Sequence, residues 1–305
     1  MFATLLGPLP RPPLPADADR TAILDAVVRA QVAAGLELVT DGGFGIGGTA
    51  LERWRTTAAM TDRPVKQVLL GPYSAGLAAA SAGSGTPDEA TTAAAAVTHA
   101  DLLALSAAGC RYIEVHEPAV TRIGSDPSER ARFREVHRGL LDGVSGPHLS
   151  LAVTGGNADE AGIETLLGAP YASLALDLIA GPDNWRLVVA MPGDRGIVCG
   201  ALSAERDTDD RPEVLVWAAG YATSTGGRGA NRVGLASASS FAELPWEVAM
   251  RKLGLLGEAT RLAALPPDER RLQLDPRAVD SRSAALGRVA PRPPRRSADR
   301  PPDQA

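Results

Sequence analysis

The sequence predicts an α/β protein in which eight parallel strands, each followed by a helix or helical turn, close into a single (β/α)₈ TIM barrel. Short apolar runs alternate with longer stretches of helical periodicity along most of the chain. Strict alternation of this kind implies parallel strands joined by right-handed crossovers. Eight such units in about 265 residues match a closed barrel, whereas an open doubly wound sheet more often stops at about five to seven strands.

The predicted strands are short apolar runs that recur at fairly regular spacing. They lie at 3–6, 36–40, 65–70, 112–115, 149–154, 173–177, 197–202 and 233–235. Two of them end at a Gly-Pro pair, Gly7-Pro8 and Gly71-Pro72, which is a strong turn signal.

The predicted helices occupy the stretches between these strands. They lie near 19–34, 50–60, 88–108, 126–142, 159–167, 182–189, 212–223 and 245–265. Asp19 can cap the first helix, and Gly35 and Gly109 stand just past the ends of the first and third, where glycine is favoured. Asp126-Pro127 begins the fourth, with proline at the first helical position.

Composition and charge limit the kind of protein this can be. The chain has 305 residues, is 45% hydrophobic and 22% charged, and carries a net charge of −5, which argues against nucleic acid as the main partner. No secretory signal and no membrane-length apolar run is visible, so we expect a cytoplasmic protein that does not bind membranes. The two cysteines, Cys110 and Cys199, are expected to be buried free thiols.

Two domains of unequal character are expected. Residues 1–275 form the barrel domain. The segment 276–305 is rich in Pro, Arg, Ser and Asp, cannot bury enough apolar surface to fold, and is predicted to be a disordered tail. Because the tail is positively charged, the other interpretation is a weak tether to an acidic partner.

Seven segments resemble, in order, motifs of the catalytic domain of the cobalamin-independent methionine synthases, within the barrel superfamily that includes uroporphyrinogen decarboxylase. The segments are ATLLGPLPRP, LELVTDGGFG, VKQVLLGPYS, CRYIEVHEPAV, LSLAVTGGN, SLALDL and NRVGLASASSFAELPWEVAMRKLGLL. No single motif is decisive, but their order and spacing extend over roughly residues 3–262. The resemblance therefore implies the same barrel independently of the periodicity.

The resemblance also implies which residues would hold a metal. Family members use a zinc ion to stabilise a thiolate. A His, two Cys and an acidic residue hold this zinc ion. The corresponding positions here are Ala152, Thr154, Ser239 and Asp177. Only the acidic position is retained, so we predict that the zinc site is lost and that no metal or other cofactor is bound.

The family's amino-acid site is also altered. Pro8, Gly43 and His116 stand where the resemblance expects Ser, Glu and an acidic residue. Each change removes a group that would hold the charged ends of an amino acid, and unpaired polar groups are costly to bury. A true methionine synthase is therefore the least favoured interpretation.

The remaining polar residues at the strand ends form the candidate site, because barrel enzymes place their chemistry there. We predict as catalytic residues Glu117, Asp177 and His116. We predict as substrate-binding residues Asp41, Arg11, Thr154, Asn157 and Ser239. The alternative is that these polar groups have a structural role and that their hydrogen bonds are made with backbone donors or with Arg11.

A convergence of carboxylates would give this set its chemistry. If Asp41, Glu117 and Asp177 meet in one cavity, their repulsion raises at least one pKa, which creates a general acid or base. His116 can share that proton or serve as the base itself.

Other patterns carry less information. A Ser–His–Asp triad can be assembled from Ser239, His116 and Asp177, but no nucleophile elbow is present. The glycines of DGGFGIGG fit a dinucleotide loop but lack the acidic residue expected about 20 residues later. The other three histidines, His99, His137 and His148, are expected at the surface.

The predicted function is a divergent, methyltransferase-like enzyme that works without zinc on a small molecule at the mouth of the barrel. The alternative is a non-catalytic barrel that binds a ligand or a partner protein. The sequence identifies neither the substrate nor the oligomeric state.

Overall fold

The computed structural model describes residues 1–274, so the predicted tail at 276–305 lies outside the described residues. All the strands of its seven-stranded sheet are parallel, in the order β1-β7-β6-β5-β4-β3-β2. The strands are β1 (Phe2–Thr4), β2 (Lys66–Leu70), β3 (Tyr112–His116), β4 (His148–Val153), β5 (Ser173–Asp177), β6 (Gly196–Leu202) and β7 (Val233–Ser237).

The predicted strand at 36–40 fills the remaining place between β1 and β2. The Leu38 amide donates to the Ala3 carbonyl at 3.2 Å, and Val39 pairs with Val65 in a parallel bridge. The Lys66 amide donates back to the Val39 carbonyl at 2.8 Å. This segment makes one bridge rather than a full ladder, yet it joins the two edges of the sheet. The fold is therefore the predicted (β/α)₈ TIM barrel, with its second strand reduced.

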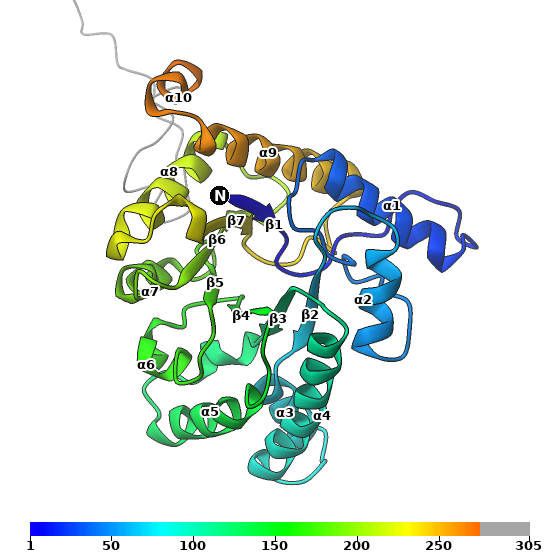
Figure 1. Cartoon of the computed structure of the whole chain (residues 1–305), viewed down its shortest axis with the longest axis vertical. Coiled ribbons are helices and arrows are strands. Elements are labelled where there is room, and N and C mark those ends of the chain that lie inside the picture. The colour runs from blue at the N-terminus through cyan, green and yellow to red at the C-terminus, as the bar shows by residue number, and fades with distance from the viewer. Residues whose placement is uncertain (275–305) are drawn as a thin grey trace, which may run out of the picture.

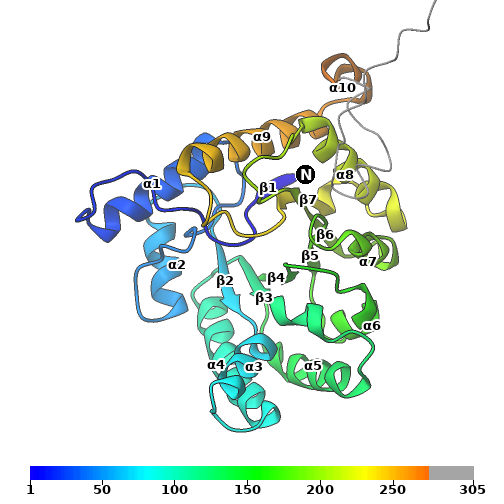
Figure 2. The same cartoon turned by 180° about the vertical axis from the view of Figure 1, so that it is seen from behind.

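The helices surround the strands, and the chain passes once around the barrel from α1 to α9 (Figures 1 and 2). They are α1 (Arg20–Ala33), α2 (Ala50–Ala58), α3 (Pro72–Ser81), α4 (Pro87–Ala107), α5 (Pro127–Leu140), α6 (Ile163–Leu166), α7 (Trp185–Ala190), α8 (Pro212–Ser224), α9 (Trp246–Ala264) and α10 (Pro267–Gln273). The sequence prediction missed α3 and α10. Gly71-Pro72 both ends β2 and begins α3, with proline at the first helical position.

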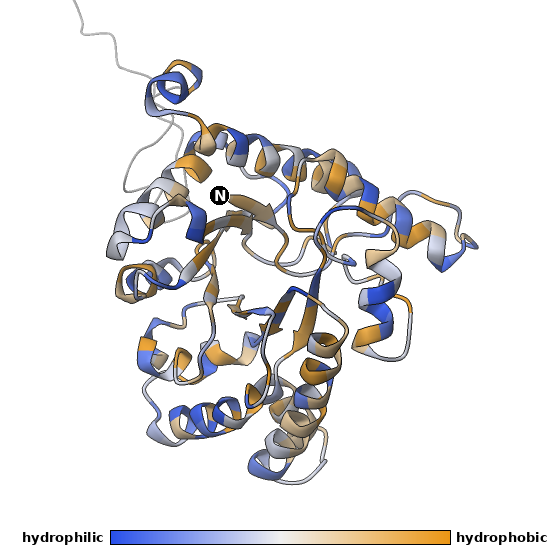
Figure 3. Cartoon of the chain, in the orientation of Figure 1, coloured by the Kyte–Doolittle hydropathy of each residue, from blue (hydrophilic) through white to orange (hydrophobic). Residues whose placement is uncertain are grey.

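Two apolar cores stabilise the barrel. The larger lies between the strands and the helices and includes both cysteines, which are buried and unpaired as predicted. Burial raises the pKa of Cys110 to about 11 and that of Cys199 to about 12, so both thiols stay protonated. In Figure 3 the strands are mostly in hydrophobic colours, whereas α5 is largely hydrophilic.

The smaller core lies inside the barrel, and three of its five buried side chains are alanine. Its buried members are Leu6, Ala152, Ala175, Val198 and Ala236. These residues come from the loop after β1 and from β4, β5, β6 and β7. Interior positions of a barrel are normally filled by larger branched side chains. The small residues found here leave room for longer polar side chains from neighbouring strands.

A buried ion pair is one such polar contact. The Lys66 ammonium lies 2.6 Å from the Glu114 carboxylate and donates to the Leu5 carbonyl at 2.7 Å. Both side chains are almost inaccessible to solvent, with 4% of Lys66 and 2% of Glu114 exposed.

No helix among the described residues is long and apolar enough to cross a membrane.

Candidate functional site

His116 and Thr154 meet at the carboxyl ends of β3 and β4. His116 is the last residue of β3, Thr154 follows β4 directly, and the two strands are hydrogen-bonded neighbours. The His116 Nε2 atom lies 2.8 Å from the Thr154 hydroxyl, within hydrogen-bond distance. Burial lowers the pKa of His116, and the Lys66 charge lowers it further, while Glu114 and Glu117 partly oppose this. The imidazole is therefore neutral near pH 7 and can accept a proton.

Asp177, the last residue of β5, is held by backbone amides. One carboxylate oxygen accepts from Gly155 at 3.0 Å, and the other accepts from Ile179 at 2.9 Å and Ala180 at 2.8 Å. Burial raises the pKa of Asp177, and these three amides act in the opposite direction. The side chain has a fixed orientation and no cationic partner among its hydrogen bonds within the described part of the chain.

A cavity of about 600 Å³ opens beside Asp177. Its polar lining residues are Asp177, Ser203, Glu205, Thr208 and Ser239. Asp177 and Ser239 were predicted for the site from the sequence, whereas the three residues of the loop after β6 were not. The cavity is at the end of the barrel where related folds place their chemistry.

Glu117 has a different environment from the one its sequence position suggested. Its carboxylate is fully buried and accepts from the amides of Tyr73 at 2.9 Å and Ser74 at 2.7 Å, in the first turn of α3. The His137 Nε2 atom lies 2.9 Å from the same carboxylate. Glu117 therefore occupies the N-terminus of α3, a position that favours negative charge.

Two neighbouring residues complete the surroundings of Glu117. A Cβ atom at Gly71 would lie 2.1 Å from the Glu117 carboxyl carbon, so only glycine fits there. His137 is 1% exposed, and its Nδ1 atom lies 2.7 Å from the Tyr171 hydroxyl. The prediction that His137 is a surface residue is wrong, because α5 turns it inward between these two partners. His148, predicted at the surface as well, is exposed.

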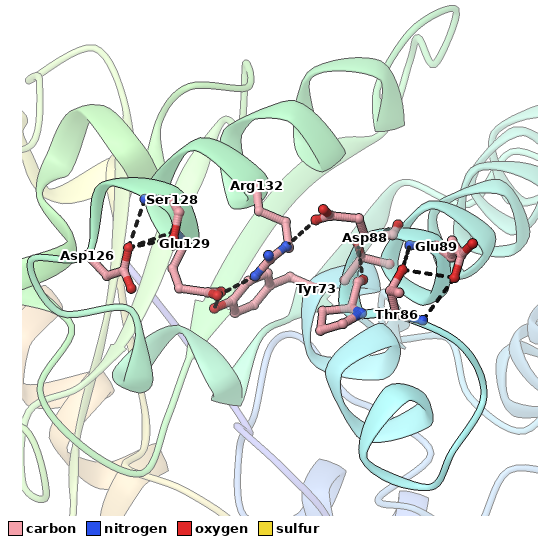
Figure 4. Close-up of polar contacts among 10 residues, drawn as sticks. Tyr73, Thr86, Asp88, Glu89, Asp126, Ser128, Glu129 and Arg132 are labelled. Atoms are coloured by element: carbon pink, nitrogen blue, oxygen red, sulfur yellow. Dashed lines mark hydrogen bonds and ion pairs between the residues drawn. The ribbon is translucent and has the colours of Figure 1, made fainter.

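A second polar chain joins α3 to α5 and α4 (Figure 4). The Tyr73 hydroxyl donates to Glu129 at 2.6 Å, and Arg132 pairs with both Glu129 and Asp88. Desolvation and the Glu129 charge raise the pKa of Tyr73, so the phenol stays protonated and donates. This network fixes α3 against its neighbours and so supports the cap at Glu117.

The other predicted binding residues lie in loops with local partners. Arg11 is exposed and donates to the backbone carbonyl of Pro15 at 2.9 Å. Asp41 accepts from the Gly43 amide at 2.9 Å. Asn157 is exposed and bonds to Asp183, donating at 3.1 Å and accepting at 2.9 Å.

The three carboxylates expected to converge have separate partners. Among the hydrogen bonds and ion pairs of residues 1–274, none joins Asp41, Glu117 or Asp177 to another of the three, or to Arg11. The structure instead groups His116 with Thr154, and Asp177 with Ser239 around the cavity. Sequence position identified the strand ends correctly but not the direction of the Glu117 side chain.

The residues at the positions that the resemblance compares with zinc ligands do not fit a zinc ion. Ala152 offers no donor atom and is packed inside the barrel, and the Thr154 hydroxyl is bonded to His116. Asp177 is the one carboxylate among the four positions, whereas a catalytic zinc needs about three protein ligands. Within residues 1–274 no group of three or more His, Cys, Asp or Glu side chains is arranged to hold a metal.

Comparison with known proteins gives a family. The family model described as the N-terminal domain of cobalamin-independent synthase matches residues 41–204, more than half of the chain. The motifs compared above belong to the catalytic domain, so sequence and family model agree on the synthases but not on the domain. No curated protein sequence matches the chain.

Several solved structures have the same fold. A B12-independent methionine synthase from Shewanella sp. W3-18-1, in complex with selenomethionine, is 14% identical with a TM-score of 0.70, covering 89% of this chain and 99% of its own. A candidate vitamin-B12-independent methionine synthase from Listeria monocytogenes is 16% identical with a TM-score of 0.63, covering 86% and 97%. A methyltransferase from Methanosarcina mazei is 10% identical with a TM-score of 0.57, covering 85% and 94%. At such low identity the likeness shows a shared barrel.

Proposed function

Because the chain belongs to the cobalamin-independent synthase family, we propose that it is a zinc-independent member that binds and acts on a small molecule at the mouth of its barrel. The observation that carries this proposal is the cavity beside Asp177, which contains a buried carboxylate and the half-buried Ser239 and, among its described lining residues, no thiol or imidazole ligand for zinc. Concave sites with a few fixed polar groups are the usual form of small-molecule sites.

His116 and Asp177 are the residues that we propose for proton handling. A neutral imidazole accepts a proton, and a carboxyl group whose pKa is raised by burial can donate or accept one nearer to neutral pH. Thr154 orients His116 through their hydrogen bond. We assign Glu117 a structural role as the cap of α3, because both of its oxygens are engaged.

Methyl transfer is the reaction class that the resemblance suggests, and here it would have to proceed without a zinc-bound thiolate.

We also propose a cytoplasmic location, since both cysteines are free and buried, as in proteins of reducing compartments. The alternative function is a barrel that binds a ligand or a partner protein without catalysis, and a ligand that binds at the mouth but is recovered chemically unchanged would favour it.

The test of the proposed function is a ligand-observed NMR screen of metabolite mixtures against the full-length protein and a Ser239→Trp variant. A tryptophan at this position would fill part of the cavity that Ser239 lines. We expect at least one metabolite to bind the wild-type protein and to lose binding in the variant. Binding that is equal in both proteins, or no binding by any metabolite, would contradict a small-molecule site at this mouth.

A further inference from the structure

The charge of the cavity beside Asp177 limits what it can bind, if the proposed function is correct. Two carboxylates, Asp177 and Glu205, line it. None of its described lining residues is Lys, Arg or His. A negatively charged group placed here would be repelled by the buried Asp177 carboxylate and more weakly by the exposed Glu205 carboxylate, whereas a cation would be attracted by both.

Basic side chains line a neighbouring cavity, which shares Thr208 with the first. Lys252 lines that cavity and is 4% exposed, and its ammonium is paired with Asp210 and donates to the Thr208 hydroxyl at 2.8 Å. Arg206 is 67% exposed at its side chain. The Lys252 charge is therefore already compensated, and Arg206 is screened by solvent.

Asp177 has hydrogen-bonding capacity left for a ligand. A carboxylate can accept about four hydrogen bonds, and this one accepts three, two of them on one oxygen. The oxygen that faces Gly155 therefore has room for one more donor. The side chain is 1% exposed, so such a donor would be bound in a site of low dielectric constant.

Hydroxyl groups supply the neutral part of the lining. Ser203, itself buried, accepts from the Glu205 amide at 3.1 Å, which fixes the start of the loop after β6. Ser239, from the loop after β7, has no side-chain hydrogen bond within the described part of the chain. Its hydroxyl is therefore available to a polar group of the ligand.

We infer that this cavity binds a small primary amine that lacks a carboxylate, with its ammonium group between Asp177 and Glu205. The inference deepens the proposed function by naming the ligand class. An amino acid carries the same ammonium group but adds a carboxylate, for which the described lining residues offer no positive partner. The cavity therefore selects decarboxylated amines over the parent amino acids.

Matched pairs that differ by one carboxylate test this directly. Isothermal titration of the full-length protein would compare 3-(methylthio)propylamine with L-methionine, cadaverine with L-lysine, and ethanolamine with L-serine. We expect at least one amine to bind, at least about tenfold more tightly than its amino acid. Asp177→Asn and Glu205→Gln should each weaken that amine by about tenfold or more, and Glu205→Gln changes an exposed loop residue that the fold tolerates.

The control variant is Glu258→Gln, which removes a carboxylate from the neighbouring cavity and should leave amine binding unchanged. Amino acids that bind as tightly as their amines would overturn the inference, and so would the absence of binding by all three amines. Neither of these two results contradicts the proposed function. That function would still be supported if another metabolite binds the wild-type protein and does not bind the Ser239→Trp variant.

Discussion

The Glu117 carboxylate lies 2.9 Å from the His137 imidazole, and both side chains are buried between β3, α3 and α5. The same carboxylate accepts two amides of the first turn of α3. We therefore predict that Glu117→Gln lowers the free energy of unfolding by about 3 kcal/mol, because the amide NH₂ group that replaces one carboxylate oxygen cannot accept the hydrogen bond that this oxygen receives, which leaves a buried donor unsatisfied. Urea denaturation measures this, with Glu135→Gln, a 75% exposed carboxylate of α5, as a control that should change by less than about 0.5 kcal/mol.

The outcome also separates the two roles considered for Glu117. A Glu117→Gln protein that is as stable as wild type but no longer binds or turns over the ligands found for the mouth would support a catalytic role and contradict the structural one.

The ion pair inside the barrel predicts a non-additive effect. Lys66→Met leaves the Glu114 carboxylate buried without its partner and should cost about 3–5 kcal/mol of unfolding free energy. The double variant Lys66→Met, Glu114→Met removes both charges and should recover most of that loss. Urea denaturation of the wild type, the two single variants and the double variant completes the cycle. Losses that simply add would show that the two side chains do not act as a pair.

The pKa of His116 predicts how stability changes in mild acid. Burial holds this pKa below its ordinary value of 6.5. As the pH falls below 6.5 the unfolded chain takes up this proton first, so His116 contributes a loss of stability with increasing acidity. The His116→Asn variant lacks this contribution. Its urea midpoint should therefore decrease less between pH 7.0 and pH 5.5 than that of wild type.

An equal decrease in the two proteins would contradict the lowered pKa of His116. The comparison with wild type matters because His148, although its side chain reaches solvent, also has its pKa lowered by partial desolvation in the folded protein and is present in both proteins.

Lys252 in α9 is predicted to position the loop after β6. Its ammonium contacts Thr208, which lines the cavity, and Asp210 in the same loop. Lys252→Met should free this loop and speed tryptic cleavage after Arg206, because proteases cut segments that open locally. Limited proteolysis followed by mass spectrometry gives the rate. Arg251→Gln, a change at the exposed neighbouring residue, should cleave like wild type, and equal rates in all three proteins would remove the positioning role.

The barrel was predictable from the sequence because it depends on local signals. Apolar runs with terminal glycines and prolines mark the strand ends, and the predicted strand at 173–177 coincides with β5. The helix α3 was missed because Gly71-Pro72 signals a strand end and a helix start equally well. The segment 36–40 has the apolar pattern of a full strand, but in the structure it forms only the single parallel bridge between Val39 and Val65.

The site was predictable only in part, since its contacts are distant along the chain. Asp177 and Ser239 could be placed at strand ends, where they line one cavity. The engagement of Glu117 with Tyr73 and His137 joins residues 44 and 20 positions away, which no local pattern reveals. The loop after β6, which lines the cavity, is held by the contact between Asp210 and Lys252, and these two residues are 42 positions apart in the chain.

The most direct test of the account is the zinc content of the purified full-length protein, prepared with zinc and without chelator and measured by elemental analysis. We predict zinc well below one ion per chain, because Ala152, Thr154 and Ser239 offer neither thiolate nor imidazole. A content near one zinc per chain, removed by chelator and restored on adding zinc, would contradict it and return a zinc-dependent thiol methyltransferase as the leading function.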